Sequence, residues 1–513
     1  MGSVYGVSKR STLSHPNLHT HCTGAQVKER VVSKITMLSP YSALGVNNGD
    51  IHTLRTALLE RMYFCKVGDE FVPPPEVEYG QIKRTLRRFH GKLCERFHAT
   101  PSTAEEVVDM YKGRKRTIYE QAMRSLEKVP VERKDARIKC FVKVEKVNVD
   151  KAPRCIQPRD PRYNLQVGRY IKHIEHRIYK RIAQVFGDGP TVMKGYTVKG
   201  VARIMKGKWD TFKSPVAIGL DATKFDMHVC EGMLKWEHSV YESIYDKFGA
   251  AEIRRLLSWQ RANTGVGYCD DGKLRYKVTG KRASGDMNTA LGNCIIMCAL
   301  VWEYALERGV PVKLVNNGDD CVVFMESESL EQFSNGLDSW FLQSGFRMTV
   351  EEPVYDFERI EFCQMRPVLA CGEYTMVRNI SVALQKDTMC TMPLDGETAR
   401  KWMYAVGEGG LALTSGVPVM QEFYSAYLRE GNPDSKFADS PIMDTGLSRM
   451  RGDLPSRWSQ VTPEARLSVF VAWGITPDEQ VALEEYYRNW WFDSQAENDL
   501  NPTEQSPVLF NVL

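Results

Sequence analysis

The sequence predicts an α+β protein whose antiparallel sheet is flanked by helices, and three stretches support this prediction. Residues 312–325, VKLVNNGDDCVVFM, form two apolar runs around an Asn-Gly pair, the strongest short-range signal for a β-hairpin. Residues 360–377, IEFCQMRPVLACGEYTMV, repeat this pattern around a Cys-Gly pair. After about Gln385 the sequence is typical of helices, with aromatic core candidates at Trp402, Tyr404, Phe423, Tyr424 and Tyr427.

The bulk composition limits the class of protein. At 513 residues the chain is too long for one ordinary hydrophobic core, so several subdomains are expected. Hydrophobic residues make up 43% and charged residues 26%, which excludes a disordered or fibrous chain. The net charge of +4 is too small to indicate nucleic-acid binding by itself. The apolar run at residues 294–302 covers about half of the roughly 20 residues that a membrane-spanning helix needs, so no membrane span is expected.

Thirteen cysteines are scattered along the chain without a CxxC pair, which is typical of reduced, buried thiols in a cytosolic protein. Two groups of residues have the chemistry of zinc ligands, but no second cluster completes a tetrahedral site for either. We therefore favour a solvated loop for the first group and an ordinary helix face for the second. The groups are His15, His19, His21 and Cys22, and His90, Cys94 and His98.

Positive charge is concentrated in one part of the chain. Residues 133–162 contain ten Lys or Arg against four Asp or Glu. Within them, IKCFVKVEKV at residues 138–147 alternates apolar and charged residues with the period of a strand. A basic strand face can simply be solvated, but here the charges continue through the proline-containing stretch at residues 151–162. We therefore interpret the region as a binding surface for a polyanion.

Carboxylates occur at the ends of two predicted strands. Asp221 ends the apolar strand VAIGL, Asp226 follows five positions later, and Asp319 and Asp320 lie at the tip of the hairpin whose turn we predict at Asn317-Gly318. If these strands are neighbours, the carboxylates converge, and converging carboxylates are stable when a divalent cation neutralises them. Oxygen ligands without Cys or His select Mg²⁺ or Mn²⁺ over zinc. The alternative for each Asp alone is that it caps or turns its own element.

Three segments in this order resemble the palm motifs of RNA-dependent RNA polymerases from plus-strand RNA viruses: DATKFD at 221–226, SGDMNTALGN at 284–293 and GDD at 318–320. KCFVKVEK and KAPRCIQPR resemble the basic fingertip motif of these enzymes, and FCQMRP resembles the hairpin that grips the primer end. The sequence between the motifs is similar to tombusvirus and carmovirus replicases (Tombusviridae). The resemblance implies a right-hand polymerase with N-terminal extension and fingers at 1–213, a palm at 214–384 with a finger insertion near 235–280, and a helical thumb at 385–513.

The resemblance also implies roles for individual residues. Asp221 and Asp319 would be the catalytic metal ligands, with Asp320 as a nearby third carboxylate, for two Mg²⁺ or Mn²⁺ ions about 4 Å apart. The ribose would be recognised by Asp226, helped by Ser284, Thr289 and Asn293, and the triphosphate by Lys143 and Arg154. Gly285 would let the backbone approach the template. The template or nucleotide channel would be lined by Lys146, Lys151 and Arg159.

One departure from the family pattern concerns the general acid for pyrophosphate. Related polymerases often have a lysine after the GDD hairpin, whereas the stretch from Trp340 to Glu361 contains none. Arg347 is the available cation there, but a guanidinium does not readily give up a proton. The role therefore stays open between electrostatic action by Arg347, another group and water.

The partners implied by the resemblance are the RNA template and product, NTPs and a membrane-anchored viral replication protein. It also implies primer-independent initiation, a longer readthrough replicase of which this chain is the polymerase part, and a location in the host cell cytoplasm at membrane-associated replication sites. Two other functions remain as alternatives: a reverse transcriptase or DNA polymerase with the same palm, and a non-enzymatic RNA-binding protein. The aromatic stretch YYRNWWFD at 486–493 is either a stacking platform or, as we favour, core.

Overall fold

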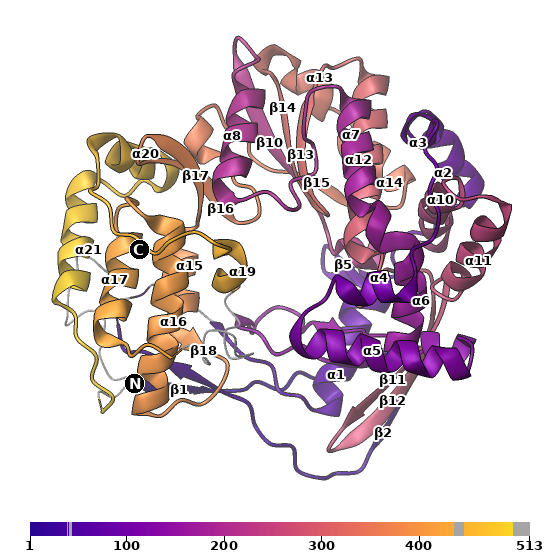
Figure 1. The fold of residues 1–513 in the computed structure, drawn as a ribbon, viewed down its shortest axis with the longest axis horizontal. Helices are drawn as coiled ribbons and strands as arrows, with labels where there is room; N and C mark the ends of the chain where they lie inside the picture. The colour runs from indigo at the N-terminus through magenta and orange to yellow at the C-terminus, as the bar shows by residue number, and fades with distance from the viewer. Residues whose placement is uncertain (38, 40–43, 435–445, 496–513) are drawn as a thin grey trace.

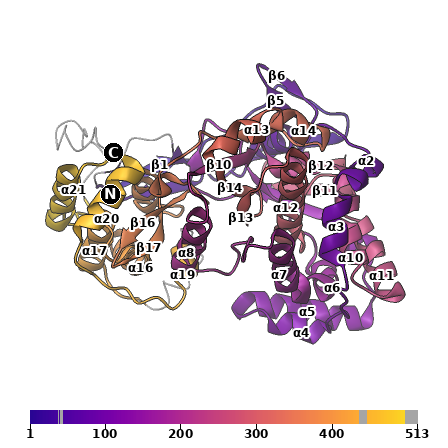
Figure 2. The ribbon, with the colours of Figure 1, turned by 90° about the horizontal axis from the view of Figure 1, so that it is seen from above.

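The structure is a computed structural model that describes residues 1–37, 39, 44–434 and 446–495. Its elements form a ring in the view of Figure 1, with the C-terminal helices on the left and the helices around α12 on the right. The same two parts are separated in the perpendicular view of Figure 2. Helices and antiparallel strands are mixed along the chain, in agreement with the predicted α+β class.

A four-stranded antiparallel sheet with the order β13-β14-β10-β15 lies at the top of Figure 1. Its strands are β13 (Lys313–Asn317), β14 (Asp320–Glu326), β10 (Pro215–Ala222) and β15 (Met348–Val350). Alternate side chains of these strands enter two different hydrophobic cores. Ile218 and Val323 pack in the core that contains helix α12, whereas Ala217 and Phe324 pack in the core of the C-terminal helices. Burial of both faces explains why the strands read as continuous apolar runs.

The predicted hairpin at residues 312–325 is confirmed, but its turn lies one residue later than predicted. Asn317 pairs with Asp320, so the two-residue loop is Gly318-Asp319 rather than Asn317-Gly318. Gly318 has φ of 78°, which a glycine adopts without steric cost and which a II′-type hairpin turn requires at its first central position. The second hairpin, β16 (Met365–Ala370) with β17 (Glu373–Arg378), turns at Cys371-Gly372 as predicted.

Helix α12 (Thr289–Arg308) contains the apolar run at 294–302 and is longer than that run. By length and composition it is the one helix in the described residues that could cross a membrane, which corrects the length argument made from the sequence. In this fold 78% of its most apolar window is buried within the protein, between α3, α7 and α10 and the four-stranded sheet. It therefore forms the centre of the larger core.

A second sheet has five strands in the order β2-β12-β11-β7-β9, and it lies at the bottom of Figure 1. It combines distant segments: β2 (Leu18–Cys22), β7 (Ile138–Val142), β9 (Cys155–Ile156), β11 (Ala262–Cys269) and β12 (Gly272–Thr279). The burial pattern of β7 alternates, as the sequence predicts for the basic strand. Residues 262–279 thus return from the central part of the chain to pair with N-terminal segments.

The N-terminal segment connects both sides of the ring. Strand β1 (Gly2–Tyr5) pairs with β3 (Val31–Lys34), which pairs with β18 (Met389–Cys390) close to the C-terminal helices, while β2 joins the five-stranded sheet. Two further small sheets are β4 (Leu44–Gly45) with β8 (Val147–Asn148), and β5 (Cys65–Val67) with β6 (Glu70–Val72). The chain before residue 40 therefore holds distant elements together.

Helices fill the space around both sheets. The N-terminal part and the central part contain α1 (Ile51–Leu58), α2 (Tyr79–Thr85), α3 (Arg87–Cys94), α4 (Ala104–Asp109), α5 (Gly113–Lys128), α6 (Pro161–Ile171), α7 (Glu175–Phe186), α8 (Val198–Trp209), α9 (Phe225–His228), α10 (Glu231–Glu242), α11 (Lys247–Ser258), α13 (Leu330–Ser334) and α14 (Leu337–Gln343). The C-terminal part contains α15 (Ile380–Asp387), α16 (Gly396–Thr414), α17 (Met420–Glu430), α19 (Leu447–Arg451), α20 (Pro463–Trp473) and α21 (Pro477–Asn489). The predicted domain boundaries at 213 and 384 stay predictions.

Candidate active site

Three of the predicted catalytic carboxylates meet at one end of the four-stranded sheet. Asp221 on β10 is the cross-strand partner of Asp320 on β14, and Asp319 occupies the turn beside them. Burial and the nearby charge of Asp221 raise the pKa of Asp319, and burial together with the charges of Asp319, Glu351 and Asp221 raises the pKa of Asp320 to about 6. Carboxylates that raise one another's pKa in this way favour binding of a cation.

A fourth carboxylate, Glu351, belongs to this group and was missed from the sequence. It follows β15, and its backbone N–H donates to Gly219 O on β10 at 2.9 Å. Its side chain lies across Gly219, where a Cβ atom would be 2.0 Å from Glu351 Oε2. Burial and the charge of Asp221 raise the pKa of Glu351. The only signal in the sequence was a glycine inside an apolar strand, which often marks close approach of another group.

The donor set suits a hard divalent cation. Within the described residues no group of three or more His, Cys, Asp and Glu side chains is arranged to hold a metal ion, so a preformed cage is absent there. Mg²⁺ commonly binds through one or two carboxylates together with water and substrate phosphates, so Asp221 and Asp319 provide a fitting pair. Asp320 is less available, because its Oδ2 accepts a hydrogen bond from Cys363 N–H at 2.9 Å.

The turn that carries Asp319 is held by its neighbours. The buried Asn316 side chain donates to Gly318 O at 2.6 Å and accepts from Gly318 N–H at 3.2 Å. Asn317 Oδ1 accepts from Lys194 Nζ at 2.7 Å, and its amide contacts Cys363 Sγ at 3.2 Å. These bonds fix the hairpin tip, and the charges of Lys194 and Arg154 oppose but do not cancel the raised pKa of Asp319.

A pocket of about 250 Å³ opens beside Asp319 and brings together several residues predicted from the sequence. Among its lining residues are Lys143, Arg154, Asp226 and Ser284. Four further cations that the sequence did not single out also line it: Arg61, Lys224, Lys281 and Arg282. Cations thus outnumber carboxylates around this pocket, which suits an anionic ligand.

Asp226 lies at the edge of a buried polar network, where the network meets the pocket. Its Oδ1 accepts from Asn293 Nδ2 at 3.1 Å, and Asn293 Oδ1 accepts from Arg282 Nε at 2.9 Å. Arg282 also forms an ion pair with Glu237, and both of these side chains have no exposed surface. Burial raises the pKa of Asp226 to about 6, although Arg282 and Asn293 oppose this shift. Asp226 and Asn293, both predicted to recognise the ribose, are therefore hydrogen-bonded to one another in a network that the sequence did not reveal, and the predicted role stays a prediction.

The other two predicted ribose-recognition residues have local hydrogen bonds. Ser284 lines the pocket, and its Oγ accepts from Gln157 N–H at 3.1 Å. Thr289 does not line the pocket, and its Oγ1 donates to Ala283 O at 2.7 Å at the start of α12. Thr289 thus shapes the loop that carries Ser284.

Lys143 and Arg154 are held by a common carboxylate, Glu145. Lys143 Nζ lies 3.0 Å from Glu145 Oε2, and Arg154 Nε donates to Glu145 Oε1 at 2.6 Å. The attraction to both cations lowers the pKa of Glu145 despite its burial. Lys143 and Glu145 follow the end of β7, and their spacing of two positions was the available signal for this partner.

The predicted channel residues lie differently from expectation. Lys146 is buried and donates to Lys386 O at 2.7 Å and Met389 O at 3.0 Å, and Arg159 is buried in an ion pair with Asp286. Both side chains therefore contact protein rather than a channel. A Cβ atom on Gly285 would lie 2.4 Å from Gln157 O, so the close approach there is to the chain's own backbone. Lys151 is exposed and does not line the pocket.

Three remaining interpretations can be compared with the structure. Arg347 does not line the pocket, and its Nε is buried without a hydrogen-bond partner, so the general acid stays open. Neither histidine-cysteine group is arranged as a metal site in the part of the chain described here. In the aromatic stretch, Tyr487 and Phe492 are buried in the C-terminal core, whereas Trp491 is 67% exposed.

A family model described as "Viral RNA dependent RNA polymerase" matches residues 19–495. The chain belongs to this polymerase family. The predicted resemblance to plant tombusvirus and carmovirus polymerases is thereby confirmed at the level of the family and its relatives. A right-hand arrangement follows from family membership.

Individual relatives agree with this assignment. The chain is 41% identical over 491 residues to the RNA-directed RNA polymerase of Maize chlorotic mottle virus (isolate United States/Kansas/1987), covering 94% of this chain and 50% of the relative. It is 42% identical over 461 residues to that of Turnip crinkle virus, covering 87% and 58%. For Tobacco necrosis virus (strain A), identity is 40% over 480 residues, covering 92% and 66%. The chain thus spans between half and two-thirds of the length of these relatives.

Proposed function

We propose that this chain catalyses template-directed RNA synthesis as the polymerase of a plus-strand RNA virus. The observation that carries the proposal is the convergence of Asp221 and Asp319 at neighbouring strand ends, beside a cationic pocket that contains Asp226, Lys143 and Arg154. The names of the relatives, all RNA-directed RNA polymerases, support the same activity. Its substrates would be an RNA template and NTPs.

The chemistry we propose is attack of a 3′-hydroxyl, or of an initiating nucleotide, on the α-phosphate of an NTP, which forms a phosphodiester bond and releases pyrophosphate. Asp221 and Asp319 would hold two Mg²⁺ or Mn²⁺ ions, which supply charge stabilisation for the attacking and leaving oxygens. Lys143 and Arg154 would donate to the triphosphate oxygens in place of Glu145, because charge-assisted bonds to phosphate are strong. Asp226, oriented by Asn293, would accept from the ribose 2′-hydroxyl.

Two alternatives make different predictions. A DNA-synthesising enzyme usually excludes the 2′-hydroxyl with a bulky side chain, whereas Asp226 and Asn293 are polar at this position. A non-enzymatic RNA-binding protein would not need metal ions. Synthesis from NTPs and from dNTPs on a defined primer-free RNA template, with and without Mg²⁺, tests all three. We expect metal-dependent incorporation of NTPs; a preference for dNTPs, or no incorporation by a folded protein, would overturn the proposal.

We further propose that the polymerase initiates without a primer and that α19 contributes to this step. Support comes from the residues around α19: Met450 and Leu454 line a pocket of about 780 Å³ that also includes Asn317 and Cys363 beside the catalytic hairpin. A helix at this place would support the first nucleotides and obstruct a preformed duplex. Replacing residues 447–453 with a Gly-Ser linker should reduce primer-free synthesis while extension of a primed template persists. Equal loss of both activities would contradict this role.

The location proposed for this polymerase is the host cell cytoplasm, at membrane-associated replication sites, through a membrane-anchored viral replication protein. The support is indirect: the relatives are longer than this chain, which leaves room for a membrane-targeting region in the whole protein. Membrane flotation of the chain with and without a candidate replication protein tests the proposal. Flotation of the chain alone would contradict it.

A further inference from the structure

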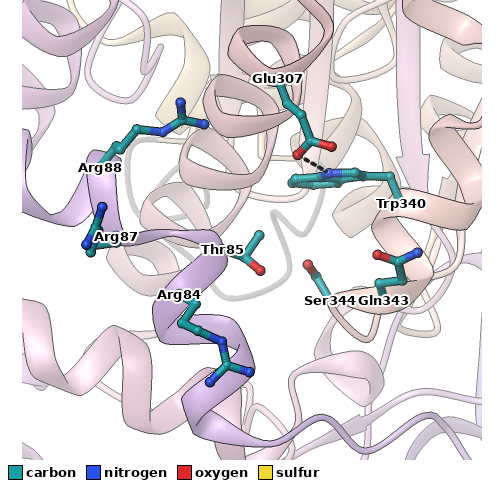
Figure 3. Close-up of a pocket in the computed structure, with 8 residues that line it drawn as sticks. All are labelled: Arg84, Thr85, Arg87, Arg88, Glu307, Trp340, Gln343 and Ser344. Atoms are coloured by element: carbon teal, nitrogen blue, oxygen red, sulfur yellow. Dashed lines mark hydrogen bonds between the residues drawn. The ribbon is translucent and has the colours of Figure 1, made fainter.

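A second pocket lies between helices α2–α3 and helix α14, apart from the candidate active site (Figure 3). Its volume is about 560 Å³. The three arginines are on the wall formed by α2–α3, and the tryptophan, glutamine and serine are on the α14 side; Arg88 extends toward Glu307, whereas Arg84 and Arg87 extend along the rim. The lining residues are Arg84, Thr85, Arg87, Arg88, Glu307, Trp340, Gln343 and Ser344.

This pocket is remote from the catalytic hairpin. Asn293 lies near the N-terminal end of α12 and binds Asp226, whereas Glu307 lies near the C-terminal end of the same helix and lines the second pocket. At 1.5 Å per residue, about 21 Å separate these two positions along the helix axis. A ligand in the second pocket would therefore bind outside the active site.

Two carboxylates lie near these arginines: Glu307 lines the pocket, and Glu303 contacts Arg88. Glu303, which is buried, accepts from Phe89 N–H at 2.8 Å and pairs with Arg88 at 2.9 Å. Glu307 accepts from the Trp340 indole N–H at 2.9 Å. Arg84 and Arg87 are exposed and have no ion pair among the residues that the structure describes. Two guanidinium groups, each a planar fork of donors that fits phosphate, thus have no ion pair at the rim of this pocket, where Glu307 supplies the one carboxylate among the lining residues.

The positive charge continues beyond the pocket. Residues 83–96 contain six basic residues and one acidic residue, Glu95. All six basic residues are exposed, and along the two helices they cover roughly 20 Å. They are Lys83, Arg84, Arg87, Arg88, Lys92 and Arg96. A small anion would occupy the pocket alone, whereas a surface of this length suits a polyanion with repeated phosphates.

We propose that the pocket between α2–α3 and α14 binds a phosphate of an RNA strand that runs over the basic surface of residues 83–96, outside the catalytic channel. Arg84 and Arg87 would each donate to one phosphate of the strand, at the rim of the pocket. The identity of the polyanion as RNA rests on the proposed function; the pocket geometry does not.

The test is the salt dependence of RNA binding by the full chain. A single-stranded RNA of several tens of nucleotides is titrated between low and moderate salt with the wild type, the double variant Arg84→Gln/Arg87→Gln and a control. The control Lys66→Gln/Lys247→Gln removes the same charge from exposed residues away from both pockets. Loss of two phosphate contacts should make the negative slope of log K against log salt shallower by about 1.4, since each phosphate contact to a single strand contributes about 0.7 to its magnitude. The control should keep the wild-type slope.

A second variant and a second probe keep the outcomes distinct. Arg84→Lys/Arg87→Lys retains the charge, so its slope should return to that of the wild type even if the glutamine variant is poorly folded. An unchanged slope in the glutamine variant, or an equal decrease in the control, overturns the proposal. Inorganic phosphate at constant ionic strength is the other probe: stabilisation of the wild type but not the variant, with an unchanged RNA slope, assigns the pocket to a small anion and also overturns it. These measurements need no polymerase activity, so they remain decisive if RNA synthesis is not observed.

Discussion

Two groups of carboxylates in this molecule differ in how far neighbouring residues compensate their negative charge. In the buried network, Glu237 accepts from Arg282, Asn288 and Tyr241, so its charge is fully compensated. At the hairpin, Asp221, Asp319 and Asp320 face one another, and no ion pair reaches them within the described residues. A satisfied network stabilises the fold, whereas the hairpin carboxylates, whose charge Lys194 and Arg154 offset only in part, cost stability until a cation binds. The comparison thus separates residues that hold the site from residues that act in it.

Among the variants proposed here, Asp319→Asn is expected to cause the largest loss of RNA synthesis. Removing the carboxylate should weaken metal binding by several kcal/mol, so RNA synthesis should fall by roughly a thousandfold. RNA binding and the melting temperature should persist, because the variant relieves repulsion and breaks no ion pair. Synthesis on a primer-free template and RNA titration measure both. Asp356→Asn, at an exposed position, is the matched control and should retain activity. Wild-type synthesis by the Asp319 variant would show that the catalytic carboxylate has been misassigned.

For Glu237→Gln, in contrast, we expect a loss of stability. Removing one partner of a buried pair leaves Arg282 uncompensated, which costs about 3–5 kcal/mol of unfolding free energy. Denaturant titration should detect this loss. Glu242→Gln is the control, because its partner Arg254 is largely exposed and such a pair contributes about 1 kcal/mol or less. Equal effects of the two variants would mean that the buried network is not a distinct stabilising unit.

Asp226 belongs to the buried network but lines the pocket, and its stability contribution should depend on pH. Its folded pKa of about 6 is raised above the ordinary value of 3.8. A raised carboxyl pKa contributes stability that is present below pH 3.8 and is lost as the pH rises through about 6. The stability of the wild type relative to Asp226→Asn should therefore fall over this window, by at most about 3 kcal/mol. Thermal unfolding at pH 4 and pH 7 measures the difference, and a constant difference would refute the shifted pKa.

The hairpin carboxylates were predictable from the sequence because their signals are local. An apolar strand ending in Asp221 and a Gly-Asp-Asp turn between apolar strands define their own geometry, and burial of both sheet faces fixes the register. Even there the turn was misassigned by one residue, since Asn-Gly and Gly-Asp are both good hairpin turns.

The supporting residues were not predictable in the same way. Glu237 and Arg282 lie 45 positions apart, and Glu351 reaches Asp221 only because β15 pairs with β10. Lys146 and Arg159 have the same local sequence character as Lys143 and Arg154, yet the fold buries the first two and brings the second two to the pocket. A basic stretch indicates polyanion binding as a whole, whereas tertiary packing decides which of its cations are available.

Lys143→Ala and Arg154→Ala test the cationic side of the pocket. Each removes a charge-assisted bond to the triphosphate, so the apparent KM for NTP should rise roughly tenfold while RNA binding changes less. Glu145 should then hold only one of the two cations. Lys139→Ala, an exposed lysine on the same basic strand, is the control and should leave the KM unchanged. Weaker RNA binding with an unaltered KM would assign these residues to the RNA instead.

Glu351→Gln should have the smallest effect and tests whether the fourth carboxylate belongs to the hairpin group. One added negative charge near a partly solvated cation contributes about 1 kcal/mol, so the Mg²⁺ concentration for half-maximal synthesis should rise about fivefold. Gly219→Ala should act in the same direction, because its Cβ would displace the flexible end of Glu351 rather than backbone. Glu352→Gln, at the next and likewise exposed position, should leave the Mg²⁺ requirement unchanged. If Glu351→Gln and Glu352→Gln behave alike, Glu351 is a bystander and the cation depends on the hairpin carboxylates alone.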